Sequence, residues 1–223
     1  TLNSVYFTNS GAEAVEGAMK LAKRVTNRTQ IIEFNNCYHG STQGALSIIG
    51  DEYWRNAYRP LLPDVTHLEY NSFESLKEIT EQTACVIAET VQAEAGIIVP
   101  TKEWILALRK KCTDTGTLLI LDEIQTGFGR TGKLWGFQHF NIMPDILLLG
   151  KALGGGMPLS PSLDHVSKHL SNYPSLAYEL QLIKRQSEVG SLRIALTDFA
   201  NRIDIPEVRQ VAALLARGEK LGT

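Results

Sequence analysis

The sequence lacks the features by which membrane, secreted and nucleic-acid-binding proteins are usually recognised. It contains no run of about 18 apolar residues, so we expect no transmembrane helix. Its net charge at pH 7 is only −2, which gives no electrostatic reason to expect binding to nucleic acid or to an acidic membrane surface. Only three cysteines are present, Cys37, Cys85 and Cys112, and they form no CxxC pair. This favours a reducing compartment in which the cysteines serve as small core residues.

The start and the composition of the chain support two further expectations. Residues 1–4 include no initiator methionine and no signal-peptide pattern. We therefore interpret the chain as one that begins within a domain, and we predict a cytoplasmic protein. A hydrophobic content of 43% and a charged content of 21% are ordinary for a soluble globular protein, and 223 residues allow one or two domains.

Short apolar runs alternate with amphipathic segments between residues 5 and 150. Each run is bounded by turn residues, which is typical of strands buried in a sheet. The predicted strands are Val5–Phe7, Ile31–Phe34, Val65–Leu68, Cys85–Ala88, Leu118–Leu121 and Ile146–Leu149. This alternation predicts an α/β fold with a mainly parallel sheet and flanking helices.

Apolar residues at helical spacing predict helices in the segments between these strands. The apolar face of the first predicted helix consists of Val15, Ala18, Met19, Ala22 and Val25, and its polar face of Glu13, Glu16, Lys20 and Lys23. A second helix is predicted near Phe73–Ile79. A third contains Trp104, Ile105, Leu108 and Cys112 on its apolar face and is predicted to end at Gly116.

The pattern changes after Pro158. Residues 161–173 are rich in Ser, Pro, His and Asn and are predicted to form a connector. Beyond the connector, the apolar residues fall into three helical groups: Leu176, Leu180 and Ile183; Leu192, Leu196, Phe199 and Ile203; and Val208, Val211, Ala212 and Leu215. We therefore predict an α/β domain over residues 1–160 and a small all-helical segment over residues 174–223, with the boundary near residue 165.

One acid and one lysine follow neighbouring apolar runs. Asp122 comes directly after the run 118–121, and Lys151 follows the run 146–149 after a single glycine. Open α/β sheets bind ligands at the carboxyl ends of their strands, so these side chains are candidates for a site that holds a cationic heterocycle. By spacing alone, a solvated lysine and a helix-capping aspartate would be the more common explanation.

Two other segments follow predicted strands. Ser10–Gly11–Ala12 opens the first helix, where unpaired N–H groups and the helix dipole favour an anion such as phosphate. A simple N-cap at Ser10 explains the same residues. Tyr38–His39–Gly40 follows the strand at residues 31–34, and the Tyr38 ring offers a face for stacking on a planar ligand. Core packing of Tyr38 is an equal alternative.

Two apparent motifs lack residues that their chemistry requires. Gly127–Lys133 has the spacing of a phosphate-binding P-loop, but neither the Ser or Thr that binds magnesium nor a helix follows the lysine. His165 and His169 stand four residues apart, but no third ligand is evident, so we predict no metal site. We interpret His67 as a structural histidine.

Several strings within residues 1–160 occur together in one known family. They are Asn9–Ala14, Tyr38–Gly40, Asp122–Gly132 and the stretch from Asp145 through Lys151 to Gly155. With this combination, and with 151 − 122 = 29 positions from acid to lysine, the sequence resembles the class III pyridoxal-phosphate aminotransferases of the ornithine, acetylornithine and 4-aminobutyrate type. The resemblance implies the large domain of fold type I, incomplete in this chain, and a homodimer in the intact family.

The resemblance also implies a role for each matching residue. Lys151 corresponds to the lysine that binds the cofactor, pyridoxal 5′-phosphate, covalently and later carries a proton between the substrate Cα and the cofactor. Asp122 corresponds to the carboxylate beside the pyridine nitrogen, where an anion keeps that nitrogen protonated. The other residues implied in cofactor binding are Ser10, Gly11 and Ala12 at the phosphate, Tyr38 and Ile124 on opposite ring faces, His39 beside Tyr38, Gln125 near the 3-oxygen, and Glu89. Glu94 is implied on the substrate side.

The sequence departs from the family pattern at several places. Thr90 and Ala93 replace the usual Pro and Gly between the two acidic site residues. Ser41 stands where the ornithine and acetylornithine enzymes carry an arginine that grips the substrate carboxylate. After Pro158 the resemblance stops, before the threonine that reaches the phosphate in the partner subunit. We therefore expect an amino donor and a 2-oxo acid such as 2-oxoglutarate as substrates, without assigning the donor.

Two other hypotheses stay open. Residues 173–223 weakly resemble the cytoplasmic helical domain of type II secretion and tight-adherence F-family membrane proteins. In that case the chain is an inactive fusion or fragment whose tail is an interaction module. The same cofactor core also serves aminomutases and decarboxylating enzymes. Because the resembled family positions its substrate with segments outside residues 1–160, we expect this chain by itself to transaminate poorly.

Overall fold

The computed structural model describes residues 2–153, 178–179, 181–183, 185–186, 192–202 and 209. By its internal contacts the chain forms two compact units. One is Ser10–Gly150, and the other combines Thr1–Asn9 with Lys151–Thr223. Within the described residues, no helix is long and apolar enough to cross a membrane.

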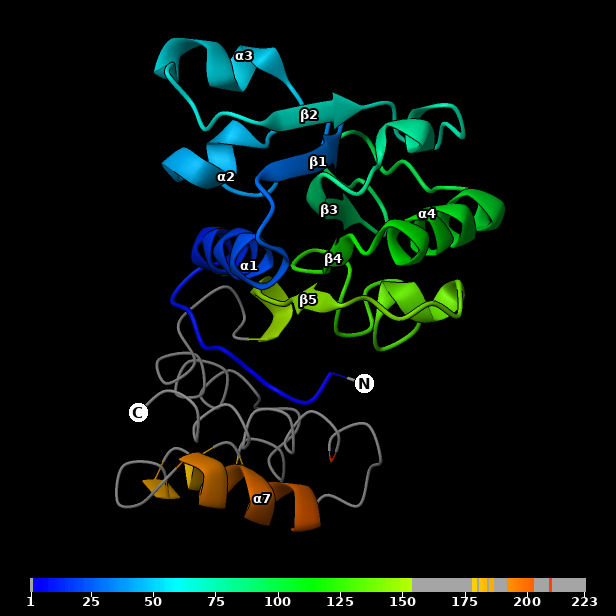
Figure 1. Cartoon of the computed structure of the whole chain (residues 1–223). Coiled ribbons are helices and arrows are strands. Elements are labelled where there is room, and N and C mark those ends of the chain that lie inside the picture. Colours follow the sequence, from blue (N-terminus) through cyan, green and yellow to red (C-terminus); the bar gives the residue numbers. More distant parts are fainter. Residues whose placement is uncertain are drawn as a thin grey trace. The chain divides into compact units, whose positions relative to one another are not determined.

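A five-stranded parallel sheet forms the centre of the Ser10–Gly150 unit (Figure 1). Its strands are β1 (Gln30–Phe34), β2 (Val65–Leu68), β3 (Thr83–Glu89), β4 (Leu118–Asp122) and β5 (Ile146–Leu148), in the spatial order β2-β1-β3-β4-β5. Each of the four pairings is parallel. β3 is buried along its whole length, as expected for a strand covered on both faces. The predicted α/β fold is confirmed.

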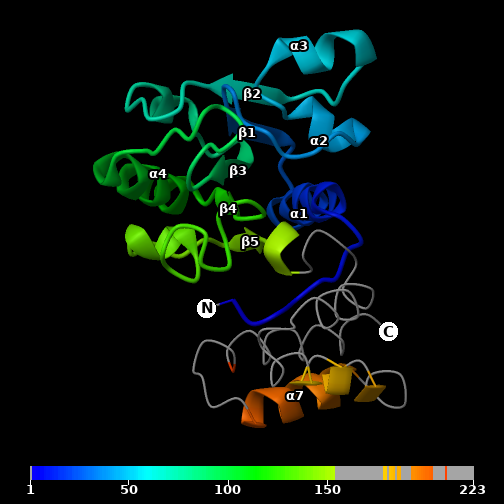
Figure 2. The same cartoon turned by 180° about the vertical axis from the view of Figure 1, so that it is seen from behind.

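Helices connect the strands and cover the sheet (Figures 1 and 2). They are α1 (Gly11–Thr26), α2 (Gln43–Ser47), α3 (Glu52–Arg55), α4 (Lys102–Thr115) and the short 3₁₀ helices η1 (Asn56–Tyr58), η2 (Ser75–Glu78) and η3 (Gly136–His139). Two predicted end signals are present: Ser10 accepts a hydrogen bond as the N-cap of α1, and Gly116 ends α4 with a φ of 65°. Thr101 also accepts a hydrogen bond as the N-cap of α4.

The two long helices lie on opposite faces of the sheet. One core cluster joins α1 to four strands through Val15, Ala18, Met19, Ala22, Ile31, Cys85, Ile87, Ile120 and Leu148. Trp104 of α4 instead contacts Phe34 edge-to-face, with ring centroids 5.1 Å apart. Side chains alternate between faces along a strand, so Ile31 and Phe34 of β1 point to opposite sides. α1 and α4 therefore bury the two faces separately.

One predicted element is wrong, and another is shorter than predicted. Residues 2–8 form no strand, and Tyr6 in the middle of the predicted run is 79% exposed. An apolar run stabilises an extended segment only when its side chains are buried, and these are not. The predicted helix near Phe73–Ile79 is reduced to the 3₁₀ turn η2, because only Leu76 and Ile79 of this short segment reach the core.

The described part of the helical segment contains α7 (Leu192–Arg202). It confirms the second predicted helix, although Ile203 lies outside the described residues. Ile183 packs with Ala195, Leu196 and Ala200 in a small apolar cluster. Other predicted features also lie outside the described residues and stay predictions: the connector at 161–173, the histidines at 165 and 169, and most of the other two predicted helices.

Candidate active site

The strand order produces a topological switch point between β1 and β3. From β1 the chain moves outward to β2 and then returns to β3 on the other side of β1. The connections that leave these two neighbouring strands therefore run in opposite directions, which is where open α/β sheets bind ligands. Tyr38–His39–Gly40 follows β1, and Glu89 is the last residue of β3. The fold thus brings two of the predicted segments to the position expected of a ligand site.

Glu89 connects the two sides of this switch point. Its Oε1 accepts a hydrogen bond from the backbone N–H of Tyr38 at 3.1 Å, and its Oε2 accepts one from that of Ala93 at 3.2 Å. The side chain is buried, and this burial raises the pKa of Glu89. In the ladder, Glu89 lies directly opposite Asp122 of β4. Glu89 therefore holds the Tyr38 backbone at the edge of the sheet where Asp122 also ends its strand.

Asp122 and His39 form a buried pair at this edge. Asp122 Oδ2 lies 2.8 Å from His39 Nδ1, and Asp122 Oδ1 accepts the N–H of Ile124 at 3.0 Å. The two residues are 5% and 2% exposed. Burial by itself lowers the pKa of His39, but the hydrogen bond and the charge of Asp122 outweigh it and raise that pKa. His39 Nε2 is buried and has no hydrogen-bond partner among the described residues.

The first turn of α1 lies against the Tyr38–Gly40 loop. Ser10 Oγ accepts the N–H of Glu13 at 3.2 Å, so Ser10 is an N-cap, as the simpler explanation held. A Cβ added to Gly40 would lie 2.7 Å from the Cβ of Ala12, and Gly40 has a φ of 121° that favours glycine. The loop approaches α1 so closely that only glycine fits. The segment 10–12 and the segment 38–40 therefore belong to one place in the fold.

Tyr38 and Ile124 have different environments. Tyr38 is 42% exposed, so the alternative that it packs in the core is wrong and its ring is open to a ligand. Ile124 is partly buried between two glycines. A Cβ on Gly11 would lie 2.9 Å from its Cδ1, and a Cβ on Gly150 would lie 3.2 Å from its Cγ2. Ile124 thus fills the space between the start of α1 and the segment after β5.

The structure also brings Gln125 and Glu94 together. Gln125 Nε2 donates a hydrogen bond to Glu94 Oε1 at 2.8 Å, across 31 residues of sequence. Glu94 is exposed and Gln125 is partly buried. One amide thus reaches the carboxylate that the resemblance places on the substrate side.

Lys151 begins the short 3₁₀ helix η4 (Lys151–Leu153) and is exposed, with a φ of 40°. β5 pairs with β4, and Leu148 lies opposite Asp122 in the register. The predicted adjacency of the two strands is therefore confirmed. Lys151 lies three residues beyond Leu148, the residue that pairs with Asp122. Lys151 belongs to the second compact unit, so its approach to Asp122 stays a prediction.

Comparison with known proteins decides the family. The family profile described as "Aminotransferase class-III" matches residues 2–170. The chain belongs to the class III aminotransferases. Its sequence is 47% identical over 171 residues to a [LysW]-aminoadipate semialdehyde/glutamate semialdehyde transaminase of Sulfolobus acidocaldarius, covering 76% of this chain and 44% of that protein. It is 44% identical over 163 residues to an acetylornithine aminotransferase of Methanopyrus kandleri, covering 73% and 42%.

Solved structures agree with this membership. The ornithine aminotransferase from Toxoplasma gondii matches 68% of this chain and 38% of its own, with 34% identity and a TM-score of 0.65. A transaminase from the marine bacterium Virgibacillus matches 74% and 43%, with 28% identity and a TM-score of 0.66. This class III chain spans less than half the length of the curated relatives above. The resemblance of residues 173–223 to secretion proteins stays a prediction.

Sequence reasoning missed two acidic residues that bond to the backbone near the candidate site. Glu123 is buried, and it accepts the N–H groups of Gly136 and Phe137 at 2.6 and 2.7 Å at the start of η3. Glu16, predicted on the polar face of α1, instead bonds to the segment after Gly40. Both residues follow ordinary helix or strand patterns, so no local signal distinguished them from solvated carboxylates.

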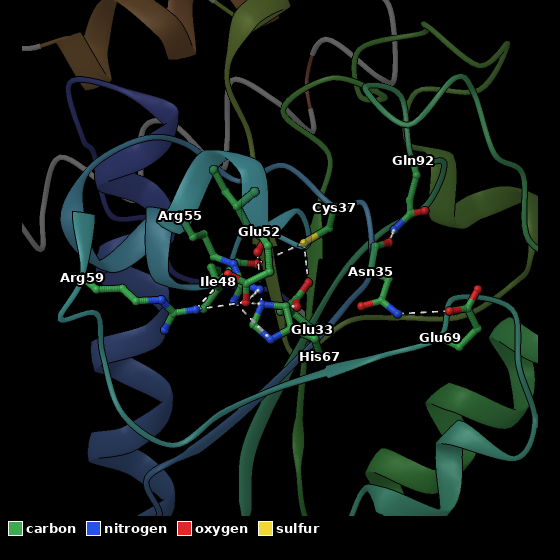
Figure 3. Close-up of polar contacts among 11 residues, drawn as sticks. Glu33, Asn35, Cys37, Ile48, Glu52, Arg55, Arg59, His67, Glu69 and Gln92 are labelled. Atoms are coloured by element: carbon green, nitrogen blue, oxygen red, sulfur yellow. Dashed lines mark hydrogen bonds and ion pairs between the residues drawn. The ribbon is translucent and has the colours of Figure 1, made fainter. Parts of the chain in front are cut away.

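A buried polar network anchors the chain just before Tyr38 (Figure 3). Glu33 of β1 contacts Cys37 Sγ through one carboxylate oxygen. Its other oxygen, Oε1, lies 2.8 Å from His67 Nε2, but the geometry does not meet that of a hydrogen bond. Arg55 Nη1 lies 2.6 Å from the same histidine nitrogen. Burial raises the pKa of Glu33 and also that of Cys37, so this thiol is not a reactive nucleophile. These contacts agree with a structural His67.

Proposed function

We propose that this chain carries the pyridoxal-phosphate site of an enzyme that transfers an amino group from an amino acid or ω-amine to a 2-oxo acid. The observation that carries the proposal is the buried Asp122–His39 pair, 2.8 Å apart, at the carboxyl end of β4. A buried carboxylate held in place by a hydrogen-bonded imidazole is suited to face a protonated heterocyclic nitrogen. Family membership and the names of the relatives support the same activity.

The residues present fit the chemical groups of this cofactor. Its phosphate matches the N-terminus of the 16-residue helix α1, where the helix dipole favours an anion. Its planar ring matches the exposed face of Tyr38 and the side chain of Ile124. Its carbonyl carbon requires an amine, which Lys151 supplies. When bound, the cofactor provides an electron sink for the electron pair that remains at Cα after proton removal.

Each side chain then has a defined task. Asp122 holds the proton on the ring nitrogen, and His39 holds the Asp122 carboxylate in place. Glu89 fixes the Tyr38 backbone, so that the Tyr38 ring is oriented against the cofactor. Gln125 donates one amide N–H to Glu94, and the resemblance places Gln125 near the 3-oxygen of the cofactor. Lys151 would bind the cofactor covalently and would move the proton at the substrate Cα.

The donor class follows from the relatives and from Ser41. The relatives are named for acetylornithine and for semialdehydes, which suggests a terminal, ω-amino donor. Ser41 is exposed and uncharged, so this position offers no cation to an α-carboxylate. We propose ω-amines with 2-oxoglutarate as the first substrates to test, and a cytoplasmic homodimer for the intact protein. Three buried free cysteines support a reducing compartment.

Covalent trapping tests the cofactor assignment. The 223-residue chain is titrated with pyridoxal phosphate, reduced with borohydride and digested, and the labelled peptide is identified by mass spectrometry. We expect one label on Lys151, lost in Lys151→Ala and kept in the control Lys110→Ala, which removes an exposed lysine paired with Asp114. Label spread over surface lysines, unchanged by Lys151→Ala, would refute the assignment.

Product analysis then tests the reaction. Amino donors are incubated with 2-oxoglutarate, and formation of glutamate is measured. Carbon dioxide release or an isomerised amino acid in place of glutamate would favour a decarboxylating or aminomutase reaction on the same cofactor.

A further inference from the structure

Glu16 makes a set of contacts that the proposed mechanism does not use. Its Oε1 accepts three hydrogen bonds, from Thr42 Oγ1 at 2.7 Å, from the N–H of Gly44 at 2.8 Å and from the N–H of Ala45 at 3.1 Å. These donors lie at the start of α2, directly after the loop that carries Tyr38. Thr42, the N-cap of α2, makes no side-chain capping bond to its own helix. A carboxylate from α1 therefore caps α2 from outside.

Glu16 stands one helical turn after Ala12, on the same side of α1. Residues four apart on a helix lie side by side, so Ala12 and Glu16 form a continuous strip. Gly40 lies against Ala12, with 2.7 Å between an added Cβ and the Ala12 Cβ, and Gly44 lies against Glu16, with 2.2 Å from an added Cβ to Oε2. The whole segment 40–44 is thus held along the first two turns of α1.

We propose that Glu16 is a positioning residue that sets the Tyr38–His39 loop relative to the phosphate-binding first turn of α1. This inference rests on the proposed function, because it assigns these two segments to one cofactor. The phosphate contacts come from α1, and the ring contacts come from the loop. The Glu16 carboxylate ties the two together, so that one ligand can use both at once. Hydrogen bonds to a charged acceptor are stronger than neutral ones, which suits this task.

Three variants of the full chain separate positioning from simple stability. Glu16→Ala removes the acceptor, and Glu16→Gln keeps an oxygen at the same reach without the charge. Glu103→Ala is the matched control, because Glu103 is an exposed carboxylate in the first turn of α4, far along the sequence from the loop. For each variant, the dissociation constant for pyridoxal phosphate, the visible circular dichroism per bound cofactor and the melting temperature of the cofactor-free protein are measured.

We expect Glu16→Ala to weaken pyridoxal phosphate binding by about tenfold, equivalent to about 1.4 kcal/mol. We also expect it to reduce the induced circular dichroism, because the ring loses its fixed orientation. Glu16→Gln should recover most of both signals, and Glu103→Ala should change neither. Should Glu16→Ala not fold, Thr42→Val removes one donor to the same carboxylate, and about a threefold weakening is expected.

The outcomes distinguish failure of the proposed function from failure of the role inferred for Glu16. An unchanged chain that binds no pyridoxal phosphate would overturn the proposed function and this inference with it. A chain that binds the cofactor, with affinity and circular dichroism unchanged in Glu16→Ala, would overturn the inference alone. A lower melting temperature in Glu16→Ala with unchanged cofactor binding would likewise show that Glu16 only stabilises the fold.

Discussion

The two ends of the candidate site are built by different means. The proposed phosphate end, Ser10–Gly11–Ala12, is a helix start that would offer backbone N–H groups, and Ser10 itself is exposed. The proposed ring end, formed by Asp122, His39 and Glu89, consists of buried ionisable side chains that bond to one another or to loop backbone. The phosphate end therefore depends on backbone conformation, and the ring end depends on particular side chains.

This difference predicts unequal sensitivity to substitution. A backbone donor survives when its own side chain changes, so the phosphate end should tolerate substitution at Ser10. A buried charged group that loses its partner cannot be solvated by water instead, so the ring end should tolerate few substitutions. The following changes test this contrast in descending order of expected effect.

The largest effect is expected for Asp122→Ala. It leaves His39 buried without its partner and removes the acceptor of the Ile124 N–H. We expect the free energy of unfolding to fall by about 3 kcal/mol, the lower end for a broken buried pair because His39 can release its proton. Urea denaturation measures the change. Asp114→Ala, which breaks an exposed pair with Lys110, should cost less than about 1 kcal/mol. Equal losses in the two variants would mean that burial does not make the Asp122–His39 pair more sensitive than an exposed pair.

Gly40→Ala tests the point where the two ends meet. The added methyl would lie 2.7 Å from Ala12 Cβ in a backbone conformation that disfavours alanine. The control Gly129→Ala has a similar positive φ of 86° but open space around the Cβ. We expect Gly40→Ala to cost about 1–3 kcal/mol more than the control, because it adds overpacking to backbone strain. The difference in urea midpoints gives the result, and similar midpoints would mean that the loop can move away from α1.

His39 predicts a pH dependence confined to the ring end. Its pKa is raised above the ordinary 6.5, so the stability that it contributes is fully present below pH 6.5 and is lost as the pH rises through the raised value. The carboxylates that act on it are Asp122, Glu89 and Glu33. Unfolding curves of the unchanged chain and of His39→Gln are compared from below pH 6.5 into the alkaline range. The unchanged chain should lose stability more steeply, and parallel curves would contradict the raised pKa.

The smallest effect is expected for Ser10→Ala at the phosphate end. The lost N-cap hydrogen bond to Glu13 should cost about 1 kcal/mol of unfolding free energy. Thr101→Ala removes the equivalent cap of α4 and should cost a similar amount. Because the phosphate donors are backbone groups, we expect pyridoxal phosphate affinity to change less than about threefold in Ser10→Ala. A loss of affinity as large as that of Glu16→Ala would show that the Ser10 hydroxyl itself binds the phosphate.

Local pattern was sufficient for much of the fold. The strand Val65–Leu68 has its predicted ends, and β4 begins at the predicted Leu118 and extends one residue beyond the predicted end, to Asp122. Gly116 ends α4 at the predicted place. These features depend on side chains close in sequence, where burial and backbone preference act together. The wrong strand at Val5–Phe7 shows the limit, because an apolar run carries no information on whether anything covers it.

The sequence by itself determined which residue types stand at the ends of buried strands, and the motifs in that order sufficed to recognise the class III family. Only the tertiary structure decided which of them meet. His39 reaches Asp122 across 83 residues, Tyr38 reaches Glu89 across 51, and Glu16 reaches Gly44 across 28. Each contact depends on the strand order and on which helix covers which face. Such pairings leave no trace in local periodicity, because a hydrogen bond depends on distance in space and not on separation along the chain.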